Sequence, residues 1–153
     1  GEGMSLIDVR HALISRATSS TPGAAIPADK TWFENKRHME GTTEIPPPNN
    51  ALWYRILWVP GPQPNMDGCG AGARVRHTGF FQVNVCEPRD VGDVPMTAEA
   101  QRIMDCFKPG TNLVYNNQTV TVTSCGMVKG LFDGTTGNPV VAVRVYWVAD
   151  VNN

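Results

Sequence analysis

The stretch from Ala51 to Val59 constrains the fold more than any other part of the chain, because it is apolar on both faces of a strand. Alternate residues of a β-strand point to opposite sides of a sheet. One side would carry Leu52, Tyr54, Ile56 and Trp58, and the other would carry Trp53, Arg55, Leu57 and Val59. Such a strand has to be covered on both sides, so we expect it inside a sheet, with the core on one side and a helix or a partner on the other.

Two segments have the spacing of amphipathic helices. Ser5 followed by Asp8 is typical of a helix start, and apolar residues then recur at helical spacing from Leu6 to Ala17. Further along the chain, Thr97 can cap a second helix. Its apolar residues fit the i, i+3, i+4, i+7 pattern up to the stop at Pro109-Gly110.

The other regular segments are predicted to be strands. Trp32-Phe33 opens a short extended piece, Arg74–Cys86 is a long strand with a bulge or bend at Gly79, and residues 140–149 form the last strand. Asn116-Asn117 tolerates left-handed φ, which predicts a hairpin between 113–115 and 120–125.

Loops are predicted where glycine and proline accumulate, at 60–73, 87–96 and 126–138. The proline-rich segment 40–50 can be neither helix nor central strand. The resulting order of elements predicts an α+β fold: a mostly antiparallel β-sheet with two α-helices packed on one face.

Length and charge limit the protein class. The chain has 153 residues, so residues 4–153 are expected to form a single domain, and Gly1-Glu2-Gly3 is interpreted as a cloning remnant ahead of Met4. The net charge of −1 disfavours a nucleic-acid-binding protein. No apolar run approaches the ~20 residues of a membrane span, and no signal peptide is present, so we expect a soluble intracellular protein with no membrane partner.

No motif points to catalysis, a metal or a cofactor. The cysteines, Cys69, Cys86, Cys106 and Cys125, form no local Cys-x-x-Cys pair and are interpreted as free, mostly buried thiols. The glycine-rich segment 68–72 lacks the preceding strand and following helix of a phosphate loop. The three histidines belong to no nucleophile signature. We therefore expect no enzymatic activity, no metal site and no cofactor.

Aromatic residues are the least ordinary feature. Trp53, Tyr54 and Trp58 surround Arg55 on one strand, and these residue types are enriched at interface hot spots. Filling of the core is the other explanation for such a cluster. Arg74 and Arg76 lie on one face of the next strand, where a phosphate contact, an exposed face and a subunit salt bridge all remain open.

Several segments, in their order and spacing, have a familiar pattern. They are Ser5-Leu-Ile-Asp-Val-Arg-His-Ala-Leu13, Trp32-Phe-Glu-Asn35, Trp53-Tyr-Arg-Ile56 after a proline-rich stretch, Gly79-Phe-Phe-Gln-Val-Asn-Val-Cys-Glu-Pro88, Phe107-Lys-Pro-Gly-Thr111 and Val120-Thr-Val122. Through them the chain, from about Ser5 to Val148, resembles the tail terminator (tail completion) proteins of long-tailed bacteriophages, a group of minor tail proteins. It departs from that pattern in a longer insert at about 36–43 and in its cysteine content.

The resemblance implies an α+β subunit that forms a six-membered ring on the end of the tail tube. Such a ring stops tube polymerisation and presents the surface that joins the filled head. The implied partners are further copies of the chain, the tail tube protein and a head–tail connector or neck protein. DNA would pass through the ring without sequence-specific contacts. The implied location is the virion, at the head–tail junction, after assembly in the host cytoplasm.

A closed ring requires two different complementary patches on each subunit. We expect the strand that carries Trp53, Arg55 and Trp58 to contribute to these patches, together with the edge that carries Arg74 and Arg76. The 60–73 loop would reach an axial partner.

Two other functions stay open at this point. One is a different neck or head–tail connector component, which ring size and the surface that binds tube protein would distinguish. The other is a small enzyme with an unrecognised site, which a deep pocket with convergent polar groups would reveal.

Overall fold

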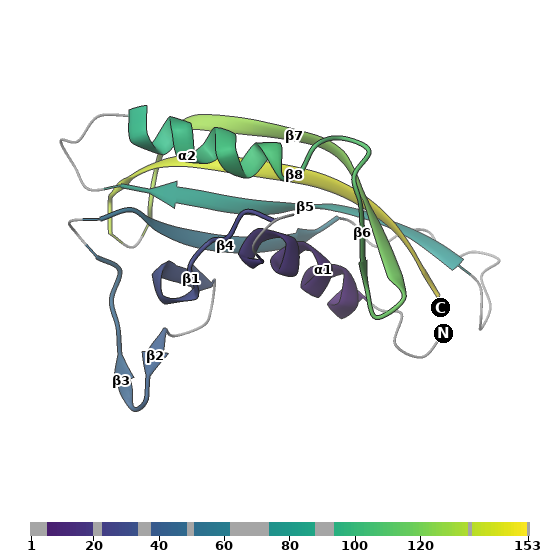
Figure 1. Cartoon of the computed structure of the whole chain (residues 1–153), viewed down its shortest axis with the longest axis horizontal. Coiled ribbons are helices and arrows are strands. Elements are labelled where there is room, and N and C mark those ends of the chain that lie inside the picture. The colour runs from purple at the N-terminus through teal and green to yellow at the C-terminus, as the bar shows by residue number, and fades with distance from the viewer. Residues whose placement is uncertain are drawn as a thin grey trace.

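A six-stranded sheet with two helices along one of its faces makes up most of the computed structural model (Figure 1). The structure describes residues 6–19, 23–33, 38–48, 51–61, 74–87, 94–134 and 136–152. The elements are α1 (Leu6–Thr18), a 3-10 turn (Ala28–Lys30), β1 (Thr31–Phe33), β2 (Met39–Glu40), β3 (Thr43–Glu44), β4 (Trp53–Pro60), β5 (Arg74–Cys86), α2 (Val94–Asp105), β6 (Asn112–Tyr115), β7 (Gln118–Phe132) and β8 (Pro139–Asn152). The predicted α+β class is confirmed.

The strands of the large sheet lie in the order β1-β4-β5-β8-β7-β6. All neighbours are antiparallel except β1 and β4, which are parallel. The long strands β5 and β8 pair without interruption from Arg74 opposite Asn152 to Cys86 opposite Val140. The three predicted strands β4, β5 and β8 therefore lie side by side, with β5 paired to β4 on one side and to β8 on the other.

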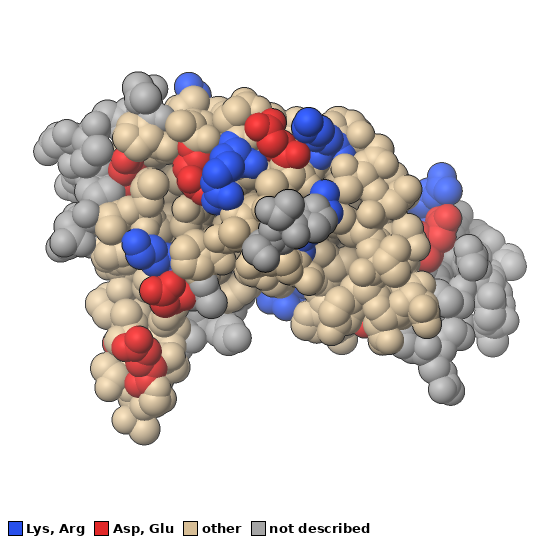
Figure 2. Space-filling model, viewed as in Figure 1, with Lys and Arg blue, Asp and Glu red and all other residues tan. Residues whose placement is uncertain are grey.

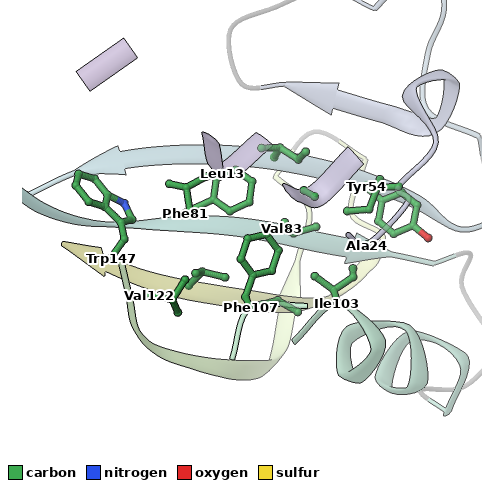
Figure 3. Packing of buried hydrophobic residues seen from close by; sticks show 14 of the residues in the cluster. Leu13, Ala24, Tyr54, Phe81, Val83, Ile103, Phe107, Val122 and Trp147 are labelled. Carbon is green, nitrogen blue, oxygen red and sulfur yellow. The ribbon is translucent and has the colours of Figure 1, made fainter. Parts of the chain in front are cut away.

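The main core lies between the sheet and the two helices (Figure 3). Leu13 of α1 and Ile103 of α2 are fully buried against alternate residues of the strands, such as Val83 and Val143. Phe107, just after α2, packs against Phe81 with ring centroids 5.9 Å apart. Both helices therefore cover the same face of the sheet, as the sequence predicts.

A second, smaller cluster covers part of the opposite face, which we call the outer face. It contains Trp32, Trp53, Cys86 and Val140, with Ile45 and Leu131 packed against it. The second face of β4 is thus covered at its start by residues of β1, of neighbouring strands and of the segment after β3. The expected cover by a helix or a partner is wrong for this part of the strand, because the chain itself folds over it.

Asn116 and Asn117 have φ angles of 51° and 66°, which are the left-handed values of a tight hairpin turn between β6 and β7. This prediction is confirmed. The predicted boundaries of α2 and β7 are wrong. Helix α2 begins at Val94, so Thr97 lies inside the helix, and Pro95 occupies the first turn, where a missing N–H is tolerated. Strand β7 continues through much of the predicted 126–138 loop, because Gly130, with φ 82°, occupies a bulge that keeps the strand paired with β8.

Gly79 is the site of a close approach and not of a bulge. It pairs in regular register with Pro60 on one side and Trp147 on the other. A Cβ at this position would lie 2.5 Å from the carbonyl oxygen of Val59 and 2.8 Å from Cζ2 of Trp147. Glycine is required there because the Trp147 indole lies directly against the backbone.

Strands β2 and β3 form a separate two-stranded hairpin, which we call the arm (residues 39–44). The sequence did not predict it, although it coincides with most of the insert at 36–43. Figure 1 shows the arm projecting away from the sheet. Its base is held by a hydrogen bond of 3.0 Å from Trp32 Nε1 to the carbonyl oxygen of Ile45 and by stacking of Trp32 on His38.

Neither helix in the described part of the chain has the length and apolar character that a bilayer crossing requires.

Candidate interaction surfaces

Trp53, the first predicted interface residue, lies in the core of the chain's own fold. Its side chain is fully buried, and its ring meets Trp32 edge-on with centroids 5.5 Å apart. The alternative that the sequence left open, core filling, therefore describes Trp53. It supports the surface of β4 from beneath and is not itself part of that surface.

Arg55 is held in an ion pair that the sequence did not predict. Its Nε donates to Oδ1 of Asp133 over 2.8 Å, and its guanidinium carbon lies 5.2 Å from the centre of the Trp53 ring. Asp133 also accepts hydrogen bonds from the backbone N–H and hydroxyl of Thr136. Burial alone would raise the pKa of the Asp133 carboxyl, but the bonds from Arg55 and Thr136 together hold its pKa below the usual value. Through these bonds, Asp133 joins the turn between β7 and β8 to Arg55 of strand β4.

The lowered pKa of Asp133 predicts a pH-dependent contribution to stability. A carboxyl whose pKa is depressed by folding stabilises the protein above its unfolded pKa, about 3.9, and this contribution is lost as pH falls toward the folded pKa. We expect Asp133→Asn to reduce the free energy of unfolding by about 1–3 kcal/mol at pH 7. The difference from wild type should shrink between about pH 5 and pH 2, as measured by urea denaturation.

Asp150→Asn is the matched control, because it removes the exposed ion pair between Asp150 and Arg76. Exposed pairs contribute about 0–1 kcal/mol. Equal losses and equal pH profiles for the two variants would contradict the prediction for Asp133.

The remaining predicted interface residues differ in how far their side chains are exposed. Trp58 is half-buried and stacks on Trp147, with ring centroids 4.9 Å apart and planes 7° apart. Arg76 is exposed and donates from Nε to Oδ1 of Asp150 of the same chain over 3.0 Å. Arg74 pairs with Asn152 in the ladder, but its side chain and residues 62–73 of the predicted axial loop lie outside the described residues. An interface role for these residues stays a prediction.

The outer face of the sheet carries a polar chain that sequence reasoning missed. Arg144 Nε donates to Oε1 of Gln82 over 2.8 Å, and Gln82 Nε2 donates to Oδ1 of Asn84 over 2.7 Å. Arg144 also lies 5.3 Å from the centre of the Phe80 ring. The alternation of β8 was the available signal, because it places Arg144 and Tyr146 on the face opposite the core.

Beside this polar chain lies an apolar groove of about 460 Å³. Its lining includes Val59 of β4, Phe80 of β5, Tyr146 of β8 and Thr123 of β7. Tyr146 is 41% exposed and lies 5.8 Å from Phe80 between ring centroids. An exposed aromatic residue next to apolar side chains is the composition found at the centre of protein interfaces.

A second, polar depression of about 210 Å³ lies next to this groove, and Val148 lines both. Arg76 and Asp150 line it together with Asn117, Gln118 and Thr121, so its principal charges already neutralise each other. In the part of the chain that the structure describes, no three His, Cys, Asp or Glu side chains are grouped so that they could hold a metal ion.

Three of the cysteines fall within the described ranges, and all three are free, as predicted. Cys86 is buried, whereas Cys106 and Cys125 are half-buried. Burial raises the pKa of the Cys86 thiol and raises that of Cys125 to about 11, so both stay protonated near neutral pH.

Charges on the helical side are mixed in sign. Figure 2 shows basic and acidic groups interspersed over this side, with an acidic group on the projecting arm. A surface without a single dominant sign offers no extended basic track for a nucleic-acid backbone on the face in view.

Of the comparisons with known proteins, one shows a family and another supports a fold. A family model described as "Phage tail terminator protein" matches residues 8–147. A solved structure, whose title states no function, is 24% identical, with a TM-score of 0.61 over 99% of this chain and 98% of its own. That similarity supports the fold alone. No curated protein matches the chain.

Proposed function

Because the chain belongs to the phage tail terminator family and is therefore a structural protein of a bacteriophage tail, we propose that it closes the end of the tail tube as a ring of six subunits. In this role it stops tube polymerisation and presents the surface to which the head is joined. The proposed partners are further copies of the chain, the tail tube protein and a head–tail connector or neck protein. The proposed position in the virion is the head–tail junction, reached after assembly in the host cytoplasm.

The family match over residues 8–147 is the observation that carries this proposal. The physical requirements of the role are compatible with the surfaces described above. A cap needs one surface for its neighbours in the ring and others for the tube and the neck, and it needs no reaction. We therefore propose a binding and assembly function and no catalytic step.

The outer face of the sheet is the proposed contact with an axial partner. It combines the exposed Tyr146 ring, the apolar groove and the ordered chain from Arg144 to Asn84. Arg55, Trp58, Arg74 and Arg76 are retained as proposed interface residues. Trp53 is proposed to act only through the support it gives to Arg55 from the core.

The test measures tube growth in the presence of this protein. Purified tail tube protein is allowed to polymerise with increasing amounts of the chain, and tube lengths are measured by electron microscopy. We expect growth to stop at amounts far below one chain per tube subunit, together with a species of about 100 kDa in light scattering, as six subunits of 16.6 kDa require. A strict monomer that leaves tube length unchanged would overturn the proposal. A ring that binds the neck protein but not the tube would instead identify a connector.

Two surface variants test the axial contact. Tyr146→Asp places a charge in the groove, whereas Val114→Asp places the same charge on the hairpin of β6 and β7, at a side chain that is 66% exposed and does not line the groove. We expect Tyr146→Asp to weaken capping about tenfold or more and Val114→Asp to retain it. Equal behaviour of the two variants would remove the groove from the proposed contact.

A further inference from the structure

Strand β7 leaves much of one of its edges unpaired. Its 15 residues all belong to one strand, but β6 pairs only with Gln118–Thr121. Val122 is then bonded to Thr111 and Gly110 of the preceding loop. From Ser124 to Val128, no further backbone hydrogen bond joins this edge to another part of the described chain. Such an edge is a ready template for an additional strand.

The unpaired part of this edge, residues 124–128, lies between two β-bulges of β7. The register of β7 with β8 shifts between Val122 and Ser124 and again between Val128 and Leu131. The five residues between these shifts carry no charge and no proline. Bulges and an edge lysine, here the exposed Lys129, are the usual means by which proteins prevent indiscriminate strand pairing. A short uncharged stretch between them therefore indicates a selective site.

The arm has the opposite character, because it is extended, exposed and rigidly rooted. All residues from Met39 to Glu44 are exposed. Two-stranded hairpins of this size are marginally stable without packing, yet the base of this one is held in place by Trp32, His38 and Ile45. An arm fixed in direction before binding loses little conformational freedom when it docks.

Arm and edge also match in chemistry. The arm presents Met39, which is 45% exposed. Glu40 follows Met39 in the chain, and Glu44 pairs with Met39 across the hairpin. The edge ends at the exposed Lys129 and at Phe132, which is 73% exposed. None of the three ion pairs among the described residues uses Glu40, Glu44 or Lys129. The arm thus offers an exposed methionine beside two negative charges, and the edge offers an exposed phenylalanine near a positive charge.

Their placement in the fold prevents the two from meeting within one subunit. Figure 1 shows the arm extending to the lower left, whereas β7 forms the upper margin of the sheet. Two different surfaces on opposite sides of a subunit are the requirement for head-to-tail assembly, which yields a ring when the rotation closes.

We propose that the arm of one subunit docks on the open edge of β7 in the next subunit, with Glu40 and Glu44 facing Lys129 and Met39 packing against Phe132. The inference rests on the proposed ring and identifies the contact that builds it. The arm adds its backbone to the open edge of β7 at the end nearest the second bulge, so that its side chains reach Lys129 and Phe132. The charges select this pairing over pairing of the edge with a second β7, where two lysines would meet.

A charge-exchange experiment tests the contact. Four proteins are compared: wild type, Lys129→Glu, the double variant Glu40→Lys with Glu44→Lys, and the triple combination. Ring formation is followed by light scattering across a concentration series, alone and with short tail tubes. We expect each charge reversal to raise the concentration needed for assembly about tenfold or more, because like charges then face each other, and the triple combination to restore it. A Val114→Lys variant controls for a change of charge elsewhere on the surface.

The outcomes separate this inference from the proposed function. Unchanged melting temperatures of all variants are expected, since every substituted side chain is exposed. Rings that form at the wild-type concentration in both charge-reversal proteins would overturn the arm-to-edge contact and leave the capping function standing. Rings that form normally in Lys129→Glu but no longer bind tubes would assign the edge to the tube protein and overturn the inference. A wild-type chain that neither assembles nor caps tubes would overturn both.

Discussion

Replacing Trp147 with alanine is expected to lower the free energy of unfolding by about 3–5 kcal/mol, a large part of the 5–15 kcal/mol that stabilises a typical domain. Trp147 is 1% exposed, stacks on Trp58 and lies against the backbone at Gly79. Its removal would open a cavity on the core face of the sheet, where the end of β4 lies beside β5 and β8. Because Gly79 has no side chain to fill the space, the neighbouring strand can relax only partly.

Tyr146→Ala is the matched control for this prediction. Tyr146 is the neighbour of Trp147 on the same strand, but it points to the outer face and is 41% exposed. We expect it to cost about 1 kcal/mol or less, since surface substitutions are commonly within about 0.5 kcal/mol of wild type. Urea denaturation followed by circular dichroism measures both variants. Similar losses for the two would contradict the assignment of Trp147 to the core.

Replacing Trp53 with alanine is also expected to cost about 3–5 kcal/mol, for a reason that distinguishes a core residue from an interface residue. Trp53 is fully buried within one subunit, so its loss should destabilise the monomer to the same extent at all protein concentrations. An interface residue would instead shift assembly and leave the unfolding of the monomer unchanged.

Trp53→Phe separates packing from hydrogen bonding at this position. The indole N–H of Trp53 is buried without a hydrogen-bond partner among the described residues. Phenylalanine removes that unsatisfied donor and keeps most of the aromatic contact with Trp32, so the expected loss is about 1–2 kcal/mol. A Trp53→Ala protein with wild-type stability and impaired assembly would restore the interpretation of Trp53 as a surface residue.

These two predictions affect how variants in tail assembly should be interpreted. A substitution in β4 can impair the proposed ring either by removing a contact or by unfolding the chain that makes it. Arg55 illustrates the difficulty, because it is partly exposed and also pairs with the buried Asp133. Stability measurements on the isolated chain are therefore needed before any of the proposed interface residues is assigned a role in assembly.

Elements whose signals are local could be predicted from the order of residues alone. Helical spacing located α1, period-two alternation located β4, β5 and β8, and Asn116-Asn117 located the hairpin, because these patterns follow from the geometry of a single element. The ordered series of short motifs also indicated the family, which the match over residues 8–147 shows. Local signals failed where a residue has two compatible roles, as for Thr97 inside α2 and Gly130 inside β7.

Which surfaces are covered and which are exposed depends on contacts between distant parts of the chain. Arg55 and Asp133 are 78 residues apart, and no local pattern announces their pairing. The cover over Trp53 comes from Trp32, Cys86 and Val140 on three other strands. The open edge of β7 exists because β6 is short. In each case the deciding contact joins segments far apart in the chain, and its free energy depends on a sheet order that alternation within one strand cannot specify.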